Sequence, residues 1–215
     1  QMTVVKSVMV SPRNPARGLN GVEGAILVQT SETGDLLAIM QAGWITKVRT
    51  AGLSCVAALR MAPPQSRVLG LVGAGKQARG HVVALADLFP LEQIRIFGRG
   101  EANIDRLARL ASELGLTPVI CDAAKDAITD ADIVVSSVTL SYDAKPFVDA
   151  RWMKPGAFAA ITDAATPWHR KQINSFGRII IDDLEQEREN SRKMVDPDLV
   201  EGDLASLVGQ GDQPH

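Results

Sequence analysis

Alternating apolar and polar positions open the chain and predict strands. Residues 2–10 (MTVVKSVMV) are rich in β-branched side chains, with Lys6 among them. A second strand is predicted over residues 24–30 and a third over 36–40, joined by the turn sequence ETGD at 32–35. Short connections between successive strands are typical of an antiparallel sheet. We therefore expect a small antiparallel sheet at the start of the chain.

The pattern then changes to helical spacing. Apolar residues recur three and four positions apart between residues 44 and 61, and two prolines at 63–64 end the helix. Arg49 lies near the start of this helix, where the helix dipole disfavours a cation. A bound anion would explain this arginine, and so would a salt bridge with a nearby acidic side chain.

From residue 67 onward, strands and helices alternate. The predicted strands span 68–72, 93–97, 117–121, 133–137, 156–162 and 178–181. The predicted helices span 77–88, 102–114, 184–194 and 204–208, and residues 126–130 are expected to form a short helix or a turn. Such alternation builds a parallel sheet with helices on both faces. The predicted fold class is α/β, with a Rossmann-type, doubly wound parallel sheet and part of an antiparallel α+β domain before it.

The link between the first parallel strand and its helix has the pattern G-x-G-x-x-A, which is typical of a dinucleotide-binding turn. Gly73 makes the tight turn, Gly75 lets the backbone approach a pyrophosphate, and Ala78 allows close packing of helix on strand. Lys76 and Gln77 open the helix, where free N–H groups and the helix dipole attract phosphate.

The end of the second parallel strand favours one nicotinamide cofactor over the other. An acidic residue there binds the ribose 2′-OH of NAD, whereas an arginine accommodates the 2′-phosphate of NADP. Here the strand ends in FGRG at 97–100, and Glu101 is expected to open the next helix. The predicted cofactor is NAD(P), with NADP favoured through Arg99, although stacking of Arg99 on adenine would suit either cofactor.

Composition narrows the class of protein. The net charge of −2 gives no basic excess for nucleic acid, and no apolar run is long enough to span a membrane. No histidine has metal-ligand spacing, so no metal site is predicted. Cys55 and Cys121 are expected to be separate buried thiols, which fits a cytoplasmic protein. The chain begins inside a strand pattern and stops without a closing element, so we expect a fragment of a longer protein.

Several motifs appear in the order that one family shows. They are GDLLAIMQAGWITKVRTAG (34–52), LVGAGKQARGH (71–81), ADIV (131–134) leading to Thr139-x-Ser141, and WMKPGA (152–157). Together they resemble the ornithine cyclodeaminase/mu-crystallin family over about residues 6–183. The resemblance implies part of a substrate-binding and dimerisation domain at 1–62, an NAD(P)-binding domain at 63–183, and a segment at 184–215 that returns to the first domain.

The resemblance also implies chemistry on small α-amino or α-imino acids. An ornithine cyclodeaminase-like ammonia-lyase oxidises the amine to an imine, cyclises it with loss of ammonia and reduces the product again. The alternatives are a ketimine or pyrroline-carboxylate reductase, an amino-acid dehydrogenase, and a non-enzymatic protein of mu-crystallin type that binds NADPH and a small ligand. The family also implies a homodimer.

Residue roles follow from the same resemblance. Lys6 matches the family's active-site lysine, Arg49 its carboxylate-binding arginine, Asp163 its catalytic acid and Thr139 a cofactor-binding position. The residue types suit these roles, because a guanidinium binds a carboxylate bidentately and an enclosed carboxyl group can exchange a proton with the substrate nitrogen. Lys6 would hold the substrate carboxylate or assist that proton transfer.

Two residues depart from the family pattern after the acid. The glutamate usually found there is replaced by Gln172, which argues against ornithine itself as the substrate. Trp168 is much larger than expected at its position. It either reshapes the substrate pocket or makes a hydrophobic contact that caps a helix.

Overall fold

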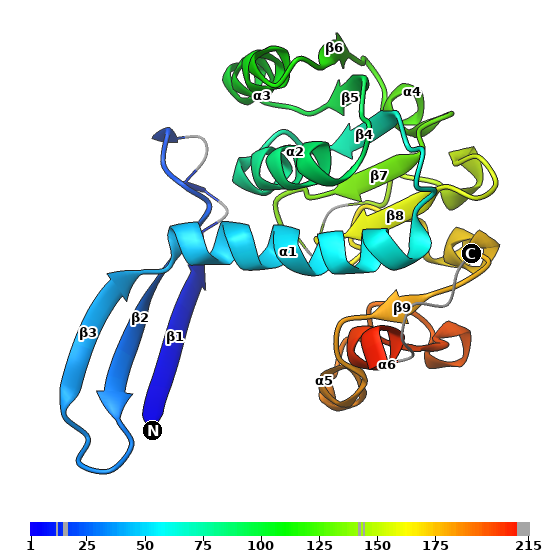
Figure 1. Ribbon diagram of the computed structural model, residues 1–215. Coiled ribbons are helices and arrows are strands. Elements are labelled where there is room, and N and C mark those ends of the chain that lie inside the picture. Colours follow the sequence, from blue (N-terminus) through cyan, green and yellow to red (C-terminus); the bar gives the residue numbers. More distant parts are fainter. Residues whose placement is uncertain (12, 15–16, 142, 144, 210–215) are drawn as a thin grey trace.

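The computed structural model describes residues 1–11, 13–14, 17–141, 143 and 145–209. Figure 1 shows a long helix, α1 (Gly43–Met61), with a small sheet projecting from its first end. A larger sheet with its own helices lies along one side of α1, and the C-terminal elements lie near its other end.

The small sheet is antiparallel, as the alternation predicts. It contains β1 (Met2–Val10), β2 (Val22–Thr30) and β3 (Leu36–Gln41) in that order. Neighbouring side chains of a strand point to opposite faces, and both Val4 and Val5 of β1 are exposed, at 59% and 49%. The sheet therefore presents apolar side chains to solvent on both of its faces.

The larger sheet is fully parallel. Its strands are β4 (Val68–Val72), β5 (Gln93–Phe97), β6 (Thr117–Ile120), β7 (Ile133–Ser136) and β8 (Phe158–Ile161), in the order β6-β5-β4-β7-β8. Its helices are α2 (Lys76–Leu88), α3 (Glu101–Glu113) and α4 (Ala124–Ile128). The strand order reverses between β4 and β7, and ligands of such sheets bind at the carboxyl ends of the strands beside this reversal. The predicted α/β fold class is confirmed.

Both faces of the parallel sheet are buried. Leu69 and Leu71 of β4 pack with residues of α1, α2 and α3, whereas Val72 and Val134 pack on the opposite face with α4 and the segment around Trp168. Burial on both faces explains why β4 and β7 are continuous apolar runs rather than alternating ones.

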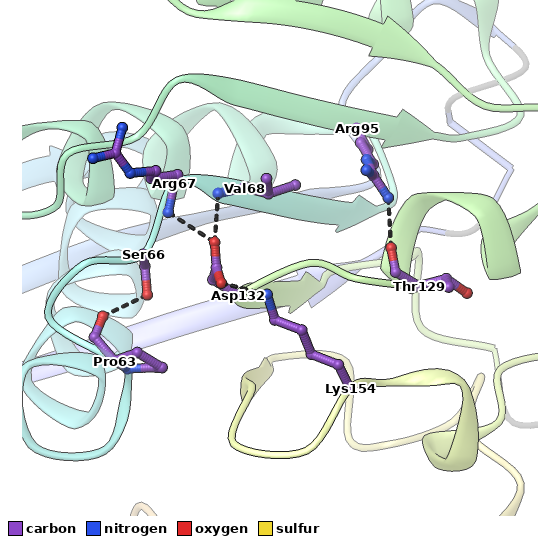
Figure 2. A network of polar contacts seen from close by, with 8 residues as sticks. All are labelled: Pro63, Ser66, Arg67, Val68, Arg95, Thr129, Asp132 and Lys154. Carbon is purple, nitrogen blue, oxygen red and sulfur yellow. Dashed lines mark hydrogen bonds and ion pairs between the residues drawn. The ribbon is translucent and has the colours of Figure 1, made fainter.

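One carboxylate joins the amino ends of β4 and β7. Figure 2 shows Asp132, just before β7, with Oδ2 accepting the backbone N–H groups of Arg67 and Val68 at 2.8 Å each. Its Oδ1 accepts a hydrogen bond from Lys154 Nζ at 2.5 Å. Partial burial opposes ionisation of Asp132, but the hydrogen bonds from Lys154 and the two N–H groups hold its pKa below the usual value. The network fastens the sheet at the end away from the candidate site.

The predicted strand at 178–181 is not part of this sheet. Only β9 (Ile180–Ile181) forms there, and it pairs in parallel with β10 (Gly202–Asp203). A groove separates β8 from residues 176–182, because both segments line it. The apolar residues around β9 are buried instead against the core that contains Trp168.

The remaining C-terminal elements are short: η2 (Ala150–Trp152), η3 (Arg170–Ser175), α5 (Leu184–Glu189), η4 (Pro197–Leu199) and α6 (Leu204–Gly209). Helix α5 is shorter than the predicted 184–194. The side chain of Lys193 donates to the carbonyls of Glu187 and Arg188, and Glu187 Oε1 accepts the N–H of Met194. These bonds fold the chain back over the end of α5.

Cys55 and Cys121 are free thiols. Burial raises the pKa of Cys55 to about 11, and Cys121 is only half-buried rather than buried as predicted, because it follows the edge strand β6. Within the described ranges, no helix combines the length and the apolar character needed to cross a membrane.

Candidate active site

The turn after β4 requires glycine at its first position. Gly73 has a φ of +105°, which is a left-handed backbone conformation, and its N–H donates to Phe97 O at 2.8 Å. A Cβ at this position would lie 2.7 Å from Ser137 O, the backbone carbonyl that follows β7. Gly73 therefore makes the tight turn that the motif predicts, and the turn packs between the ends of β5 and β7.

The start of α2 is open where a pyrophosphate would bind. Gly75 occupies the N-cap position with no side-chain cap, and a Cβ built on it would meet no atom within 4 Å. Ala78 is fully buried and lets the helix pack closely against the sheet. Uncapped N–H groups facing free space fit the pyrophosphate of a dinucleotide.

Lys76 and Gln77 tie this helix end to the rest of the chain. Lys76 Nζ pairs with Glu23 Oε1 of β2 at 3.2 Å, and Gln77 Nε2 donates to Thr46 O of α1 at 3.4 Å. Gln77 Oε1 is buried without a hydrogen-bond partner among the described residues. The cofactor turn is thus linked to both the small sheet and α1.

Arg99 and Thr139 lie beyond the carboxyl ends of β5 and β7. Both side chains are exposed. Helix α3 begins at Glu101, as predicted, so this acid belongs to the helix and leaves Arg99 in the loop after β5. The loop that would contact the adenosine ribose accordingly presents a guanidinium.

A second short network docks α1 on α2. His81 Nδ1 lies 2.8 Å from Gln77 O, and His81 Nε2 lies 2.9 Å from Ser54 Oγ of α1. Because a carbonyl can only accept, Nδ1 carries the proton and Nε2 is left as an acceptor for the Ser54 hydroxyl, which also lies 3.2 Å from Thr50 O. Burial lowers the pKa of His81 against the opposing effect of its hydrogen bond to Gln77 O, which keeps the ring neutral at pH 7.

Asp163 follows β8 and is 4% exposed. Its Oδ2 accepts hydrogen bonds from the Ser136 hydroxyl and from Val138 N, the latter at 3.1 Å. The backbone N–H groups of Asp163 and Ala165 lie near the carboxyl, but Oδ1 has no hydrogen-bond partner in the described part of the chain. Burial raises the pKa of Asp163, although these donors work in the opposite direction. A buried carboxyl with a raised pKa is suited to proton exchange near neutral pH.

A groove of about 790 Å³ runs along α1. Arg49 and Gln77 line it, and so do Thr162 and Ala164, which lie on either side of Asp163 in the sequence. We call it the α1–β8 groove; its other residues come from β8 and from 176–182. Arg49 is exposed, and it lies close enough to Lys6 of β1 for their charges to interact. Slight burial and the Arg49 charge lower the pKa of Lys6. Lys6 and Arg49 are therefore neighbours near the start of α1, and Arg49 shares the groove with the turn that holds Asp163.

Trp168 and Gln172 take up places that the sequence did not determine. Trp168 is fully buried, so it does not reshape the groove; its ring packs on Phe176 with centroids 5.7 Å apart, and its Nε1 donates to Ser136 Oγ at 3.1 Å. Gln172 lies in η3. Ser136 was missed because it ends an apolar strand, and the polar pair at 136–137 was the only signal for it. Among the residues described, no group of three or more His, Cys, Asp or Glu side chains is placed to hold a metal ion.

Comparison with known proteins places this arrangement in a family. One family model matches residues 1–206. The chain belongs to the ornithine cyclodeaminase/mu-crystallin family. A ketimine reductase mu-crystallin from Macropus fuliginosus is 32% identical over 142 residues, which make up 66% of this chain and 43% of that protein. The chain thus spans about half the length of the curated relatives it matches.

Solved structures share the fold of this family member. A Delta(1)-pyrroline-2-carboxylate reductase from Thermococcus litoralis, in complex with NADH and L-proline, has a TM-score of 0.81 at 22% identity and covers 99% of this chain and 69% of its own. A lysine cyclodeaminase that recognises L-lysine, L-ornithine and L-2,4-diaminobutyric acid has a TM-score of 0.80 at 24% identity, with coverages of 96% and 61%. Both likenesses extend over the small sheet, α1 and the parallel sheet together.

Proposed function

We propose that this protein is an NAD(P)-dependent enzyme that interconverts a small α-amino acid and its α-imino acid. The observation that carries the proposal is the α1–β8 groove, because Arg49 and the residues on either side of Asp163 both line it. The open, uncapped start of α2, which follows the carboxyl end of β4, supports dinucleotide binding. A nicotinamide bound there would supply or remove the hydride at the substrate Cα.

The chain's own residues would hold the substrate and move its proton. The Arg49 guanidinium binds the α-carboxylate bidentately and orients Cα, while the neighbouring Lys6 adds a second cation for the same carboxylate. The lowered pKa of Lys6 also fits a role in proton transfer. Asp163, whose pKa is raised by burial, donates its proton to the nitrogen and accepts it again in the reverse direction.

NADP is the favoured cofactor. Arg99 is exposed in the loop after β5, and the acidic residue nearest to it, Glu101, is the first residue of α3. A guanidinium at this position pairs with a 2′-phosphate, whereas a ribose 2′-OH needs an acceptor. Thr139, beyond the end of β7, lies at the same edge of the sheet and is proposed to contact the cofactor.

A second candidate is the full cyclodeaminase reaction, in which the imine cyclises with loss of ammonia and is then reduced. The lysine cyclodeaminase structure shares the fold of this chain over 96% of its length. The presence of Gln172 where the family has a glutamate argues against ornithine as the substrate of such a reaction. We therefore rank imine reduction first and cyclodeamination second.

A homodimer is proposed through the small sheet. Its apolar side chains are exposed on both faces, including Val4, Val5 and Met9 of β1. Apolar surface on both sides of a three-stranded sheet favours association.

The experiment that tests the proposal is a substrate screen of the full-length protein with NADPH and NADH. Cyclic imines, α-keto acids with amines, and ornithine are supplied in turn. Consumption of NAD(P)H with an imine identifies a reductase, and ammonia release without net change in cofactor identifies a cyclodeaminase. Asp163→Asn should abolish turnover while NADPH still binds, and Asp198→Asn, at an exposed position of η4, should leave turnover unchanged. Absence of turnover with every substrate would refute the proposal.

A further inference from the structure

Asp163 is connected to two side chains that no part of the proposed chemistry uses. The connection runs from Trp168 Nε1 to Ser136 Oγ at 3.1 Å, and from the Ser136 hydroxyl to Asp163 Oδ2. All three side chains are buried: Trp168 and Ser136 are 0% exposed and Asp163 is 4% exposed. Water therefore does not compete for these hydrogen bonds.

The direction of each hydrogen bond is determined by chemistry. An indole N–H can only donate, so Ser136 Oγ acts as its acceptor and keeps its single proton for another partner. The carboxyl group accepts at Oδ2 whether it is ionised or carries its proton on Oδ1, so the Ser136 proton points to Asp163 Oδ2. Val138 N donates to the same oxygen at 3.1 Å. Oδ2 therefore receives two donors, whereas Oδ1 is buried with no partner among the described residues.

The backbone that joins the members of this network has an uncommon conformation. Ala164 and Ala165 have φ values of +53° and +54°, in the left-handed region that residues with a Cβ seldom adopt. Hydrogen bonds from Thr166 N to Asp163 O, at 3.2 Å, and from Trp168 N to Ala165 O, at 3.1 Å, close the turn. This turn brings Trp168 back beneath Asp163, and burial of the indole holds the strained residues in place.

We infer that Ser136 and Trp168 are positioning residues for Asp163, which fix Oδ2 as a hydrogen-bond acceptor and so set the orientation of the carboxyl group that exchanges the catalytic proton. The inference rests on the proposed role of Asp163 as the proton donor. Neither residue touches substrate in this scheme: Trp168 orients the Ser136 hydroxyl, and Ser136 orients the carboxyl. Trp168 thus orients Asp163 through Ser136 and does not shape the groove.

The test is a titration of the Asp163 carboxyl in the full-length protein by infrared difference spectroscopy, with Asp163→Asn as the subtraction reference. Ser136→Ala removes one donor from the ionised form, so the titration midpoint should rise by about one pH unit. Ser136→Thr keeps a hydroxyl and should restore the midpoint. Ser137→Ala is the matched control, because Ser137 Oγ is buried with no hydrogen-bond partner in the described chain.

Trp168→Phe provides a second, independent variant. Loss of the indole N–H frees the Ser136 hydroxyl to turn, so the midpoint should rise by less than in Ser136→Ala, while Trp152→Phe in η2 should leave it unchanged. Thermal unfolding of each variant establishes that it is folded; if Ser136→Ala does not fold, the tryptophan pair decides. An unchanged midpoint in Ser136→Ala or in Trp168→Phe, or a Ser136→Thr variant that behaves like Ser136→Ala, overturns the inference.

The spectroscopic readout needs no turnover, which separates this inference from the proposed function. If no substrate reacts but the midpoints move as expected, the proposed function fails while the hydrogen-bond network stands. If imines are reduced, the alkaline limb of the pH–rate profile should move upward with the same variants. Turnover with an unmoved alkaline limb refutes the positioning role and leaves the proposed function intact.

Discussion

Gly73 and Gly75 lie two residues apart in one turn, yet the structure assigns different costs to an added methyl group at each. At Gly73 the alanine must adopt a φ of +105°, which costs about 1–3 kcal/mol. Its Cβ would also lie 2.7 Å from the backbone oxygen of Ser137, so strands β4 and β7 must move apart. We expect Gly73→Ala to lose about 3 kcal/mol, which lowers the melting temperature of a chain of this size by roughly 6–12 °C.

Gly75→Ala should behave differently. Its φ of −78° is ordinary, and no atom lies within 4 Å of the new Cβ, so the cost is limited to a less favourable N-cap of about 1 kcal/mol. The same methyl group occupies the space in front of α2 where a pyrophosphate would lie. NADPH affinity should therefore fall at least about tenfold, or 1.4 kcal/mol.

Thermal unfolding followed by circular dichroism measures the first effect, and titration of NADPH fluorescence measures the second. The expected pattern is an unstable Gly73→Ala and a stable Gly75→Ala that binds NADPH poorly. A Gly75→Ala variant that binds NADPH as the unchanged protein does would refute the placement of the pyrophosphate. Equal melting temperatures for the two variants would refute the packing of the turn between β5 and β7.

Four further predictions concern charge and assembly. Arg99→Ala should weaken the binding of NADPH by about tenfold without weakening the binding of NADH. Arg109→Ala, on the exposed side of α3, should change neither affinity, and equal losses of affinity for both cofactors in Arg99→Ala would contradict a 2′-phosphate contact. Burial raises the pKa of Asp163. The stability that its protonated carboxyl contributes is therefore complete below the ordinary pKa of 3.8 and is lost as the pH rises through the pKa of the folded state. Asp163→Asn should accordingly raise the melting temperature at pH 8 and have little effect at pH 3.5, and the opposite order would show that the carboxylate is not penalised by burial. Because the pKa of Asp132 is lowered, its carboxylate stabilises the fold above pH 3.8, and this stabilisation is lost as the pH falls through the pKa of the folded state. Lys154→Ala should therefore lower the free energy of unfolding by about 1 kcal/mol at pH 7 and by progressively less in acid, which urea unfolding measures. Solution scattering of the full-length protein should give the mass of a dimer, and a monomer mass would count against association through the small sheet.

Much of the fold could be predicted because its signals are local. The alternation in β1–β3, the helical spacing of α1 and the apolar run before Gly73 each report burial within one element. The G-x-G-x-x-A turn could be recognised because positive φ and close approach require glycine whatever surrounds it. The prediction that residues 178–181 belong to the parallel sheet of β4 was wrong, because a short apolar run does not indicate which strand it pairs with.

The candidate site could be predicted only in part, because local patterns do not indicate which distant residues come together. Lys6, Arg49 and Asp163 were selected by resemblance, and their roles stay predictions. The closeness of Lys6 to Arg49, and the groove that Arg49 shares with the turn around Asp163, depend on contacts between residues more than 40 positions apart. Ser136 could not be distinguished from any other serine at a strand end.

The sequence by itself determined the order of strands and helices, the glycine turn for a dinucleotide and the arginine after β5, because each depends on the conformation and burial of a few neighbouring residues. Only the tertiary structure decided that Trp168 lies beneath Asp163 and that its indole N–H is linked to the carboxyl through Ser136. The distance between side chains on separate strands is set by the packing of the whole sheet and by the left-handed turn at 164–165. No local pattern encodes that distance.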